Sequence, residues 1–334
     1  MKTTSILPAG LAARLWATRP RLTRPWATVA LTALVLPALA AAAEANDDPS
    51  CAGVHVAELG WTDLAFTTAV ADVLTDSLGY KLKSDLLGLE VVYQALKLGK
   101  LDVFMGNWRP VQDVQFKQYF DEGAVEVLGP NLQGAKYTVA VPTYVAEGGV
   151  KSFADLDKFA DKFDRKIYGI EPGSNQPLID AVNKNEYGLG KWKVIESSEQ
   201  GMLTQVDKDY KKQKWIAFLG WEPHAMNIDY KLTYLNGGDD VFGPNFGSSD
   251  VYTLSRKGYA AQCPNIAKMF SQLKFNVDFE NQGIHMMLKE GKNGKEAAAA
   301  MMKQHPELVK QWLAGVATLG GADGLAAVEK KIGG

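Results

Sequence analysis

The stretch Val54-His55-Val56-Ala57-Glu58-Leu59-Gly60-Trp61-Thr62-Asp63 decides the first two elements of the fold. Its first six residues alternate in part and carry β-branched side chains, so they predict a strand. Gly60 interrupts that strand, and Thr62 or Asp63 is predicted to cap a helix that follows. Trp61 then lies at the carboxyl end of a strand, where open α/β sheets bind ligands. The alternative is that Trp61 is a core or lid residue and Asp63 only a helix cap.

The same arrangement recurs twice further along the chain. Trp108 follows the predicted strand Leu101–Met105, and Trp221 follows the predicted strand Trp215–Leu219. In all three cases a glycine stands one or two residues before the tryptophan. Strands alternate with helical segments at this spacing, which predicts parallel sheets in α/β lobes.

The length of 334 residues is sufficient for two lobes that each have a core. We expect a first lobe formed by residues 47–138 together with residues 236–334, and a second lobe formed by residues 139–235. The chain then crosses between the lobes twice.

The N-terminus has the pattern of an export signal. Residues 1–43 contain no acidic residue, an apolar segment from Ala27 to Leu39, and a run of small residues that ends at Ala43. This pattern predicts a secretory signal peptide cleaved near Ala43, and therefore an exported protein. The apolar segment is too short and too interrupted for a membrane span, so we do not expect a membrane-embedded protein.

The net charge and the cysteine content limit the classes of ligand and the cellular compartment that suit the mature protein. Removing the five basic residues of the signal leaves 31 Lys and Arg of the 36, against 38 Asp and Glu, so the mature net charge is near −7. An acidic exported protein suits a cationic or neutral small ligand and not a nucleic acid. The two cysteines, Cys51 and Cys263, are expected to form one disulfide in an oxidising compartment. Two buried thiols are the alternative.

Signatures of catalysis are scarce in this sequence. It contains no Gly-x-Ser-x-Gly elbow, no phosphate-binding loop and no His-Glu-x-x-His motif. The four histidines lack metal-ligand spacing, and we interpret each as solvated or satisfied within the fold. We therefore expect no catalytic residues, no metal and no cofactor.

The aromatic residues carry the positive signal. Trp61, Trp108 and Trp221 at strand ends are predicted to face the cleft between the lobes. Such rings suit a quaternary ammonium, because that cation donates no conventional hydrogen bond and is recognised by π faces. Four rings would contribute about 2–8 kcal/mol, and micromolar binding needs about 8 kcal/mol.

Four segments together resemble one family. They are Trp61-Thr62-Asp63, Asn107-Trp108-Arg109-Pro110, Gly169-Ile170-Glu171-Pro172-Gly173 and Gly220-Trp221-Glu222-Pro223-His224. In this order they are similar to the substrate-binding proteins of ABC importers for glycine betaine, choline and other quaternary amines. The resemblance covers essentially the whole mature chain. It implies a type 2 periplasmic binding protein fold, lobe closure around the ligand, and an ABC transporter permease as the partner of a monomeric protein.

The resemblance also implies which residues bind the ligand. The aromatic box of the family maps onto Trp61, Trp108, Tyr137 and Trp221. A carboxylate and an asparagine hold the hydroxyl end of the ligand in choline-type members, and these map onto Asp63 and Asn175. The turn from Gly173 to Gln176 is shorter than the family's usual loop, so that Ser174 is the alternative to Asn175. For Tyr137, the alternative is a strand residue packed at the lobe boundary.

Asp63 bears on the choice of ligand. A carboxylate accepts a hydrogen bond from the hydroxyl of choline and complements its charge, whereas it repels the carboxylate of glycine betaine or carnitine. The sequence therefore predicts a choline-binding protein, with glycine betaine or carnitine as the alternative ligands. An exported enzyme acting on a choline ester is a third interpretation, and it lacks a visible nucleophile and base. A purely structural or adhesive role does not explain three tryptophans at strand ends.

Overall fold

The computed structural model describes residues 47–333. The predicted signal peptide, residues 1–43, therefore lies outside the described residues. The strands within the described range are β1 (Gly53–Glu58), β2 (Lys81–Leu86), β3 (Val103–Arg109), β4 (Val125–Pro142), β5 (Lys166–Tyr168), β6 (Lys193–Ile195), β7 (Phe218–Glu222), β8 (Leu232–Tyr234) and β9 (Ser248–Arg256).

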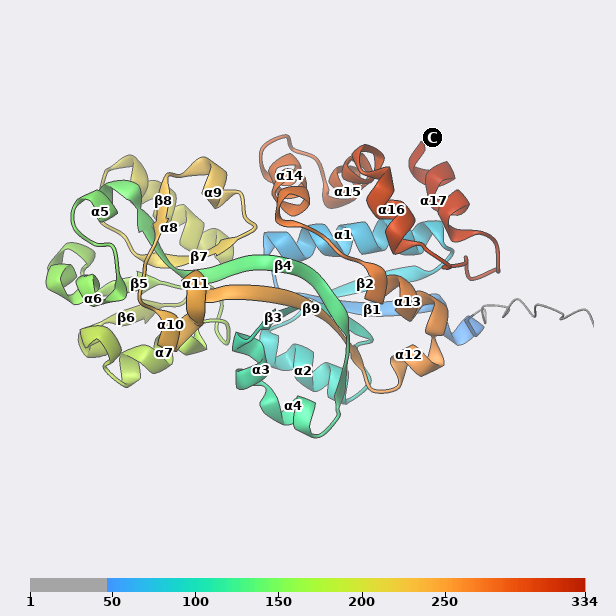
Figure 1. Ribbon diagram of the computed structural model, residues 1–334, viewed down its shortest axis with the longest axis horizontal. Helices are drawn as coiled ribbons and strands as arrows, with labels where there is room; N and C mark the ends of the chain where they lie inside the picture. The colour runs from blue at the N-terminus through green and yellow to red at the C-terminus, as the bar shows by residue number, and fades with distance from the viewer. Residues whose placement is uncertain (1–46, 334) are drawn as a thin grey trace, which may run out of the picture. The chain divides into compact units, whose positions relative to one another are not determined.

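These strands form one curled sheet with the order β2-β1-β3-β9-β4-β7-β5-β6, while β8 pairs with β4. The strands at each end are parallel, as predicted: β1 pairs with β2 and β3, and β5 pairs with β6 and β7. The long strands β4 and β9 are antiparallel to each other and join the two ends (Figure 1). We call the two ends the β1–β3 half and the β5–β7 half. The fold is the expected α/β fold with two lobes.

The α-helices within the described range are α1 (Thr62–Ser77), α2 (Leu89–Lys97), α3 (Val111–Gln115), α4 (Lys117–Asp121), α5 (Thr143–Glu147), α6 (Phe153–Leu156), α7 (Gln176–Asn183), α8 (Glu199–Lys211), α9 (Met226–Asp229), α10 (Asp239–Phe242), α11 (Pro244–Gly247), α12 (Tyr259–Gln262), α13 (Pro264–Gln272), α14 (Val277–Leu288), α15 (Gly294–Gln304), α16 (Pro306–Trp312) and α17 (Gly324–Gly333). The same range contains the 3₁₀ helices η1 (Pro49–Ala52), η2 (Asp157–Phe163) and η3 (Glu186–Lys191). In the β1–β3 half, α1 packs with α14, α15 and α17, while α2, α3 and α4 cover the opposite face (Figure 1). The C-terminal helices thus complete the lobe that begins the chain.

The turn from β1 into α1 begins the site. Gly60 has a φ of +82°, which is a left-handed conformation that glycine adopts readily. The helix α1 begins at Thr62, and its N-cap residue Trp61 offers no side-chain cap. The prediction that Thr62 or Asp63 caps this helix was therefore wrong, and both residues lie in its first turn. Trp61 cannot cap the helix because its indole has no acceptor atom, and a carboxylate from a distant segment accepts from the backbone N–H of Thr62.

The other two tryptophans lie differently from the prediction. Trp108 is the sixth residue of β3, and Trp221 is the fourth of β7, so both lie inside strands and near their ends. The strands run on because β3 pairs with β9 through Trp108 and β7 pairs with β4 through Trp221. Of the three, only Trp61 follows its strand.

One disulfide joins the start of the described chain to a much later segment. Cys51 and Cys263 are bonded across a sequence separation of 212 residues, which confirms the predicted pairing. Both residues are buried. A closed loop of this length stabilises the fold by about 5 kcal/mol in the chain-entropy model, by restricting the unfolded chain.

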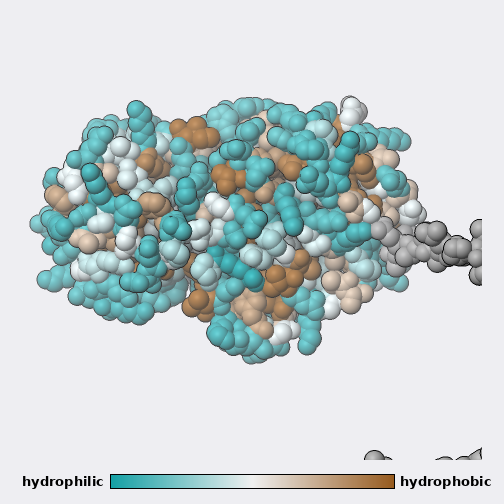
Figure 2. Space-filling view, viewed as in Figure 1, coloured by the Kyte–Doolittle hydropathy of each residue, from teal (hydrophilic) through white to brown (hydrophobic). Residues whose placement is uncertain are grey.

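The surface is mainly hydrophilic on the face shown in Figure 2, with apolar side chains in separate patches. Among residues 47–333, no helix combines the length and apolar character needed to cross a lipid bilayer. The proposed lobe boundaries, 47–138 with 236–334 and 139–235, stay a prediction. The strand β4 continues through residues 138 and 139.

Candidate functional site

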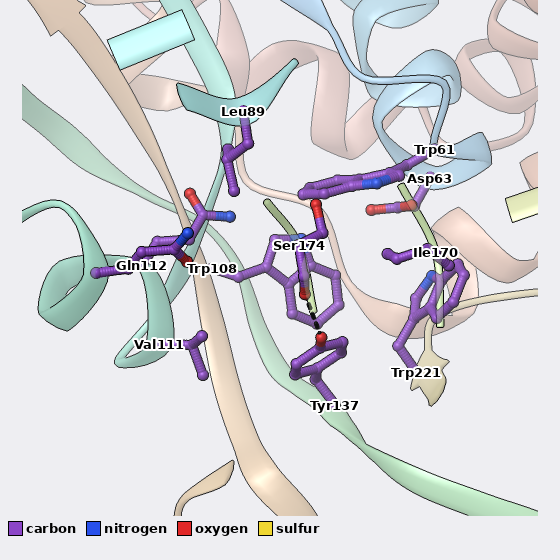
Figure 3. A pocket seen from close by; sticks show the side chains of 11 residues that line it. Trp61, Asp63, Leu89, Trp108, Val111, Gln112, Tyr137, Ile170, Ser174 and Trp221 are labelled. Carbon is purple, nitrogen blue, oxygen red and sulfur yellow. Dashed lines mark hydrogen bonds between the residues drawn. The ribbon is translucent and has the colours of Figure 1, made fainter. Parts of the chain in front are cut away.

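A cavity lies between the two halves of the sheet. It is lined by Trp61, Asp63, Leu89, Trp108, Val111, Gln112, Gln115, Tyr137, Ile170, Ser174 and Trp221. The aromatic rings lie around a common space, and the Asp63 carboxyl group lies beside Trp61 and Trp221 (Figure 3). Five of the six predicted ligand-binding residues thus share one cavity.

Trp61 forms the wall that comes from the β1–α1 turn. It is buried, and its indole N–H donates to Oε1 of Glu171 at 2.5 Å. Glu171 follows β5, in the other half of the sheet, and also accepts from the hydroxyl of Ser174. The ring of Trp61 is therefore oriented by a carboxylate from the opposite side of the cavity.

Tyr137 and Trp221 form a second wall. They stand directly opposite each other in the antiparallel pair of β4 and β7, so both side chains project from the same face of the sheet. The Tyr137 hydroxyl donates to the backbone oxygen of Ser174 at 2.7 Å (Figure 3). Burial, followed by the charge of Glu171, raises the pKa of Tyr137, so the hydroxyl remains a donor at neutral pH. The hydrogen bond holds the Tyr137 ring against the turn before α7.

Trp108 completes the aromatic set from β3. Its ring centroid lies 6.3 Å from that of Tyr137, with the ring planes tilted by 58°. Its indole N–H is buried and has no hydrogen-bond partner within residues 47–333. A buried donor without a partner is costly, so this group favours a ligand or water that offers an acceptor.

Asp63 is the one carboxyl side chain among the described residues that line the cavity. It is buried, and its Oδ1 atom has no hydrogen-bond partner in the described part of the chain. Burial, then the nearby charge of Glu199 and also that of Glu171, raises the pKa of Asp63 to about 8. Without a ligand the carboxyl group is therefore mainly protonated at pH 7, and a cation placed beside it would favour the ionised form.

Asn175 is the predicted residue that does not line the cavity. Its side-chain oxygen accepts from the backbone N–H of Ile170 at 2.8 Å. Its amide nitrogen donates to the backbone oxygens of Ile170 and Glu171 and to the carboxylate of Glu196. The amide is thus committed to the turn after β5, whereas Ser174, the alternative, faces the cavity.

Several residues at the site were not predicted. The cavity is also lined by Leu89, Val111, Gln112, Gln115 and Ile170. Two further carboxylates, Glu171 and Glu199, lie behind the rings. Glu171 belongs to the Gly169–Gly173 segment that supported the family resemblance, but no role was predicted for this residue. Glu199 has no local signal, because its partners are remote in sequence.

A curled two-lobed sheet with a ligand cavity between its halves defines the class of extracytoplasmic substrate-binding proteins. The model of the family described as the substrate binding domain of ABC-type glycine betaine transport systems matches residues 52–304. This chain belongs to that family, and it is the substrate-binding protein of an ABC importer of the glycine betaine/choline type.

Three known proteins of this type are similar to this chain to different degrees. An ABC-transporter choline binding protein, solved in complex with choline, is 45% identical over 86% of this chain and 100% of its own, with a TM-score of 0.84. Lactococcal OpuAC, solved in its closed form with glycine betaine, is 28% identical over 78% of this chain and 98% of its own, with a TM-score of 0.70. A glycine betaine/carnitine transport binding protein of Listeria monocytogenes is 24% identical over 163 residues, which are 48% of this chain and 53% of that protein.

Proposed function

We propose that this protein binds choline in the cavity and delivers it to an ABC transporter permease. Trp61, Trp108, Tyr137 and Trp221 would surround the trimethylammonium group, and Asp63 would accept a hydrogen bond from the hydroxyl. Ser174 replaces Asn175 in this proposal, because its side chain faces the cavity. The similarity to a choline-bound protein at 45% identity supports the same ligand.

The composition of the cavity is the observation that carries this proposal. Aromatic and aliphatic groups line most of it, no Lys, Arg or His is among the described lining residues, and Asp63 is acidic. Choline carries a net positive charge that these groups complement, whereas the carboxylate of glycine betaine or carnitine meets no cationic partner. Cation–π contacts with four rings contribute about 2–8 kcal/mol, so one or two polar contacts complete micromolar affinity.

Glycine betaine or carnitine is the second candidate within the same family. Two observations favour it: the unpartnered indole N–H of Trp108, and an Asp63 carboxyl group that is mainly protonated without a ligand. Both groups could donate a hydrogen bond to a ligand carboxylate. The two candidates therefore differ in the protonation state of Asp63 that they require.

Calorimetric titration of the mature protein separates the candidates. We expect choline to bind at micromolar or tighter affinity at pH 8, and glycine betaine, carnitine and acetylcholine to bind more weakly. Glycine betaine binding as tightly as choline would instead indicate an osmoprotectant importer. If no quaternary amine bound, the proposed aromatic cage would be wrong.

The dependence of affinity on pH gives an independent test. Ionised Asp63 favours choline, so the affinity for choline is expected to rise with pH and level off above the Asp63 pKa of about 8. Between pH 7 and pH 9 the dissociation constant should fall about tenfold, because about a tenth of the ligand-free sites are ionised at pH 7. For glycine betaine held by protonated Asp63, the affinity should fall over the same range. A flat profile for choline would contradict a contact with ionised Asp63.

The cellular setting follows from the family and the N-terminal sequence. We propose that residues 1–43 direct export, that the mature protein is a periplasmic monomer, and that binding closes the lobes so that the closed form docks on the permease. The transport family gives no support to the choline-ester enzyme.

A further inference from the structure

Glu199 is a buried carboxylate that lies outside the cavity and contacts its walls. It is the first residue of α8, with 1% of its surface exposed. Its Oε2 accepts from the backbone N–H of Thr62 at 2.9 Å, and its Oε1 accepts from the Thr62 hydroxyl. Oε1 also lies 3.1 Å from Nε2 of His224. Three donors therefore meet on one carboxylate, and we call Thr62, Glu199 and His224 the Glu199 network.

The contact with Thr62 joins the two halves of the sheet. Thr62 begins α1 after β1, while Glu199 begins α8 after β6, at the opposite end of the strand order. The two residues are separated by 137 positions in sequence. Because α1 has no side-chain cap of its own, Glu199 satisfies its first free N–H from the other half. This contact can exist only when the two halves lie close together around the cavity.

His224 extends the network to the far wall of the cavity. Its Nδ1 accepts from the backbone N–H of Met226 at 2.9 Å, which assigns the ring hydrogen to Nε2 and makes this atom the donor to Glu199. The His224 ring also packs edge-on against Trp221, with centroids 5.0 Å apart. A continuous chain of contacts therefore runs from Trp221 through His224 and Glu199 to Thr62, which stands between Trp61 and Asp63.

We propose that Glu199 is a positioning residue that assembles the binding cage when the lobes close. By bonding Thr62 and His224 together, it brings the Trp61–Asp63 segment and Trp221 to their places on opposite sides of the ligand. This inference rests on the proposed function, since the cage must bind a ligand for its assembly to affect affinity. Glu199 itself does not line the cavity, so its effect on affinity is indirect.

Because three donors share the Glu199 carboxylate, substitutions that remove an acceptor or a single donor test the network. Glutamine keeps the shape of Glu199, but it has one acceptor oxygen, and its amide N–H₂ would face a donor of the network. Thr62→Val removes only the hydroxyl donor, and Thr62→Ser retains it. Asp209→Asn is a matched control, because Asp209 is also buried on α8 and accepts from the side chain of Gln205 on the same helix.

Affinity for choline should be measured at pH 9, where Asp63 is ionised in the parent. We expect Glu199→Gln to weaken binding about tenfold, mainly through faster dissociation, because a charge-assisted hydrogen bond between the two halves of the sheet is lost. Thr62→Val should weaken binding severalfold, and Thr62→Ser and Asp209→Asn should bind like the parent. A folded Glu199→Gln variant with parental affinity and dissociation rate would overturn the proposal, as would an equal loss in Asp209→Asn.

A pH profile reports the effect of the Glu199 charge on Asp63, which also faces Glu171 and, from α14, Glu280. The charge of Glu199 contributes to the raised pKa of Asp63, so Glu199→Gln should move the midpoint of the choline profile to a lower pH. Because the lost charge alone causes this shift, the closed population of the ligand-free protein is the measurement that separates positioning from a charge effect.

Measuring lobe closure in the ligand-free protein tests the role of Glu199 independently of whether choline is the ligand. Lys100→Cys and Lys191→Cys place fluorophores on exposed positions of the two halves, while Cys51 and Cys263 remain in their disulfide. Energy transfer in the ligand-free protein should report a smaller closed population for Glu199→Gln and for Thr62→Val than for the parent. Equal closed populations would contradict the proposal, even if choline binds. If choline does not bind the parent but the populations differ, the choline assignment fails and the closure role stands.

Discussion

Asp63→Asn should weaken choline binding about a hundredfold at pH 9. At this pH the parent carboxylate is ionised and complements the ligand charge, whereas asparagine keeps the shape and one acceptor oxygen but no charge. Truncating one member of a buried, hydrogen-bonded charge pair costs about 2–5 kcal/mol, and the retained acceptor places the loss at the lower end. The pH dependence of choline binding should also disappear, because asparagine does not titrate.

The same substitution should stabilise the ligand-free protein at high pH. The pKa of Asp63 is about 8 in the folded protein and about 4 in an unfolded chain. Between these values the folded state binds more protons than the unfolded state, so the parent loses stability as the pH rises from about 4 to about 8. The Asp63→Asn variant escapes that loss, because its amide stays neutral. The difference in melting temperature between the variant and the parent should therefore grow over this range and then level off.

Titration calorimetry and thermal unfolding at pH 6, 7, 8 and 9 measure both effects. Asp72→Asn is the matched control, since Asp72 lies on the same helix and pairs with Lys295 away from the cavity. Its choline affinity should equal that of the parent. If Asp63→Asn bound choline like the parent at pH 9, Asp63 would have no role in ligand binding. Loss of affinity with gain of stability would identify a residue retained for function.

Trp108→Leu should weaken choline binding about thirtyfold while the protein stays folded. Leucine retains apolar bulk and removes the π face, and a desolvated cation–π contact contributes about 2 kcal/mol. Trp108→Phe should retain most of the affinity because it keeps an aromatic face, and Trp108→Ala should lose at least as much as leucine. Unchanged affinity in the leucine variant would remove Trp108 from the proposed cage.

Trp215→Leu provides the control for the tryptophan series. Its ring is partly exposed and lies 4.0 Å from the ammonium group of Lys162, so it makes a cation–π contact outside the cavity. We expect this variant to bind choline like the parent, with a lower melting temperature because the ring also packs against Phe159 and Phe163. Parallel losses in the Trp108 and Trp215 variants would point to a general effect on folding.

Local pattern was sufficient for much of the fold. The alternation of strands and helices predicted a parallel sheet, and in the structure β1 pairs in parallel with β2 and with β3. The glycine before Trp61 marked the turn into α1. Two cysteines in an exported chain predicted the bond between Cys51 and Cys263. The strands and the turn follow from residues that are close in sequence. The disulfide follows because two cysteines allow only one intramolecular pairing.

Other features depend on partners that no local pattern reveals. The strands continue through Trp108 and Trp221 because β9 and β4 supply hydrogen bonds from remote segments. The side chain of Asn175 points into the turn after β5 and not into the cavity. Its amide group is hydrogen-bonded there to the backbone of Ile170 and Glu171 and to the carboxylate of Glu196.

The sequence alone therefore predicted a quaternary amine as the kind of ligand, from the tryptophans near strand ends and from the resemblance to one family, which implied the carboxylate. Only the tertiary structure decided that the cap of α1 comes from Glu199 and that the Asp63 carboxyl group is mainly protonated at neutral pH when no ligand is bound. The physical reason is that hydrogen bonding and desolvation depend on distances in space. Residues 62 and 199 meet only when both halves of the sheet have folded.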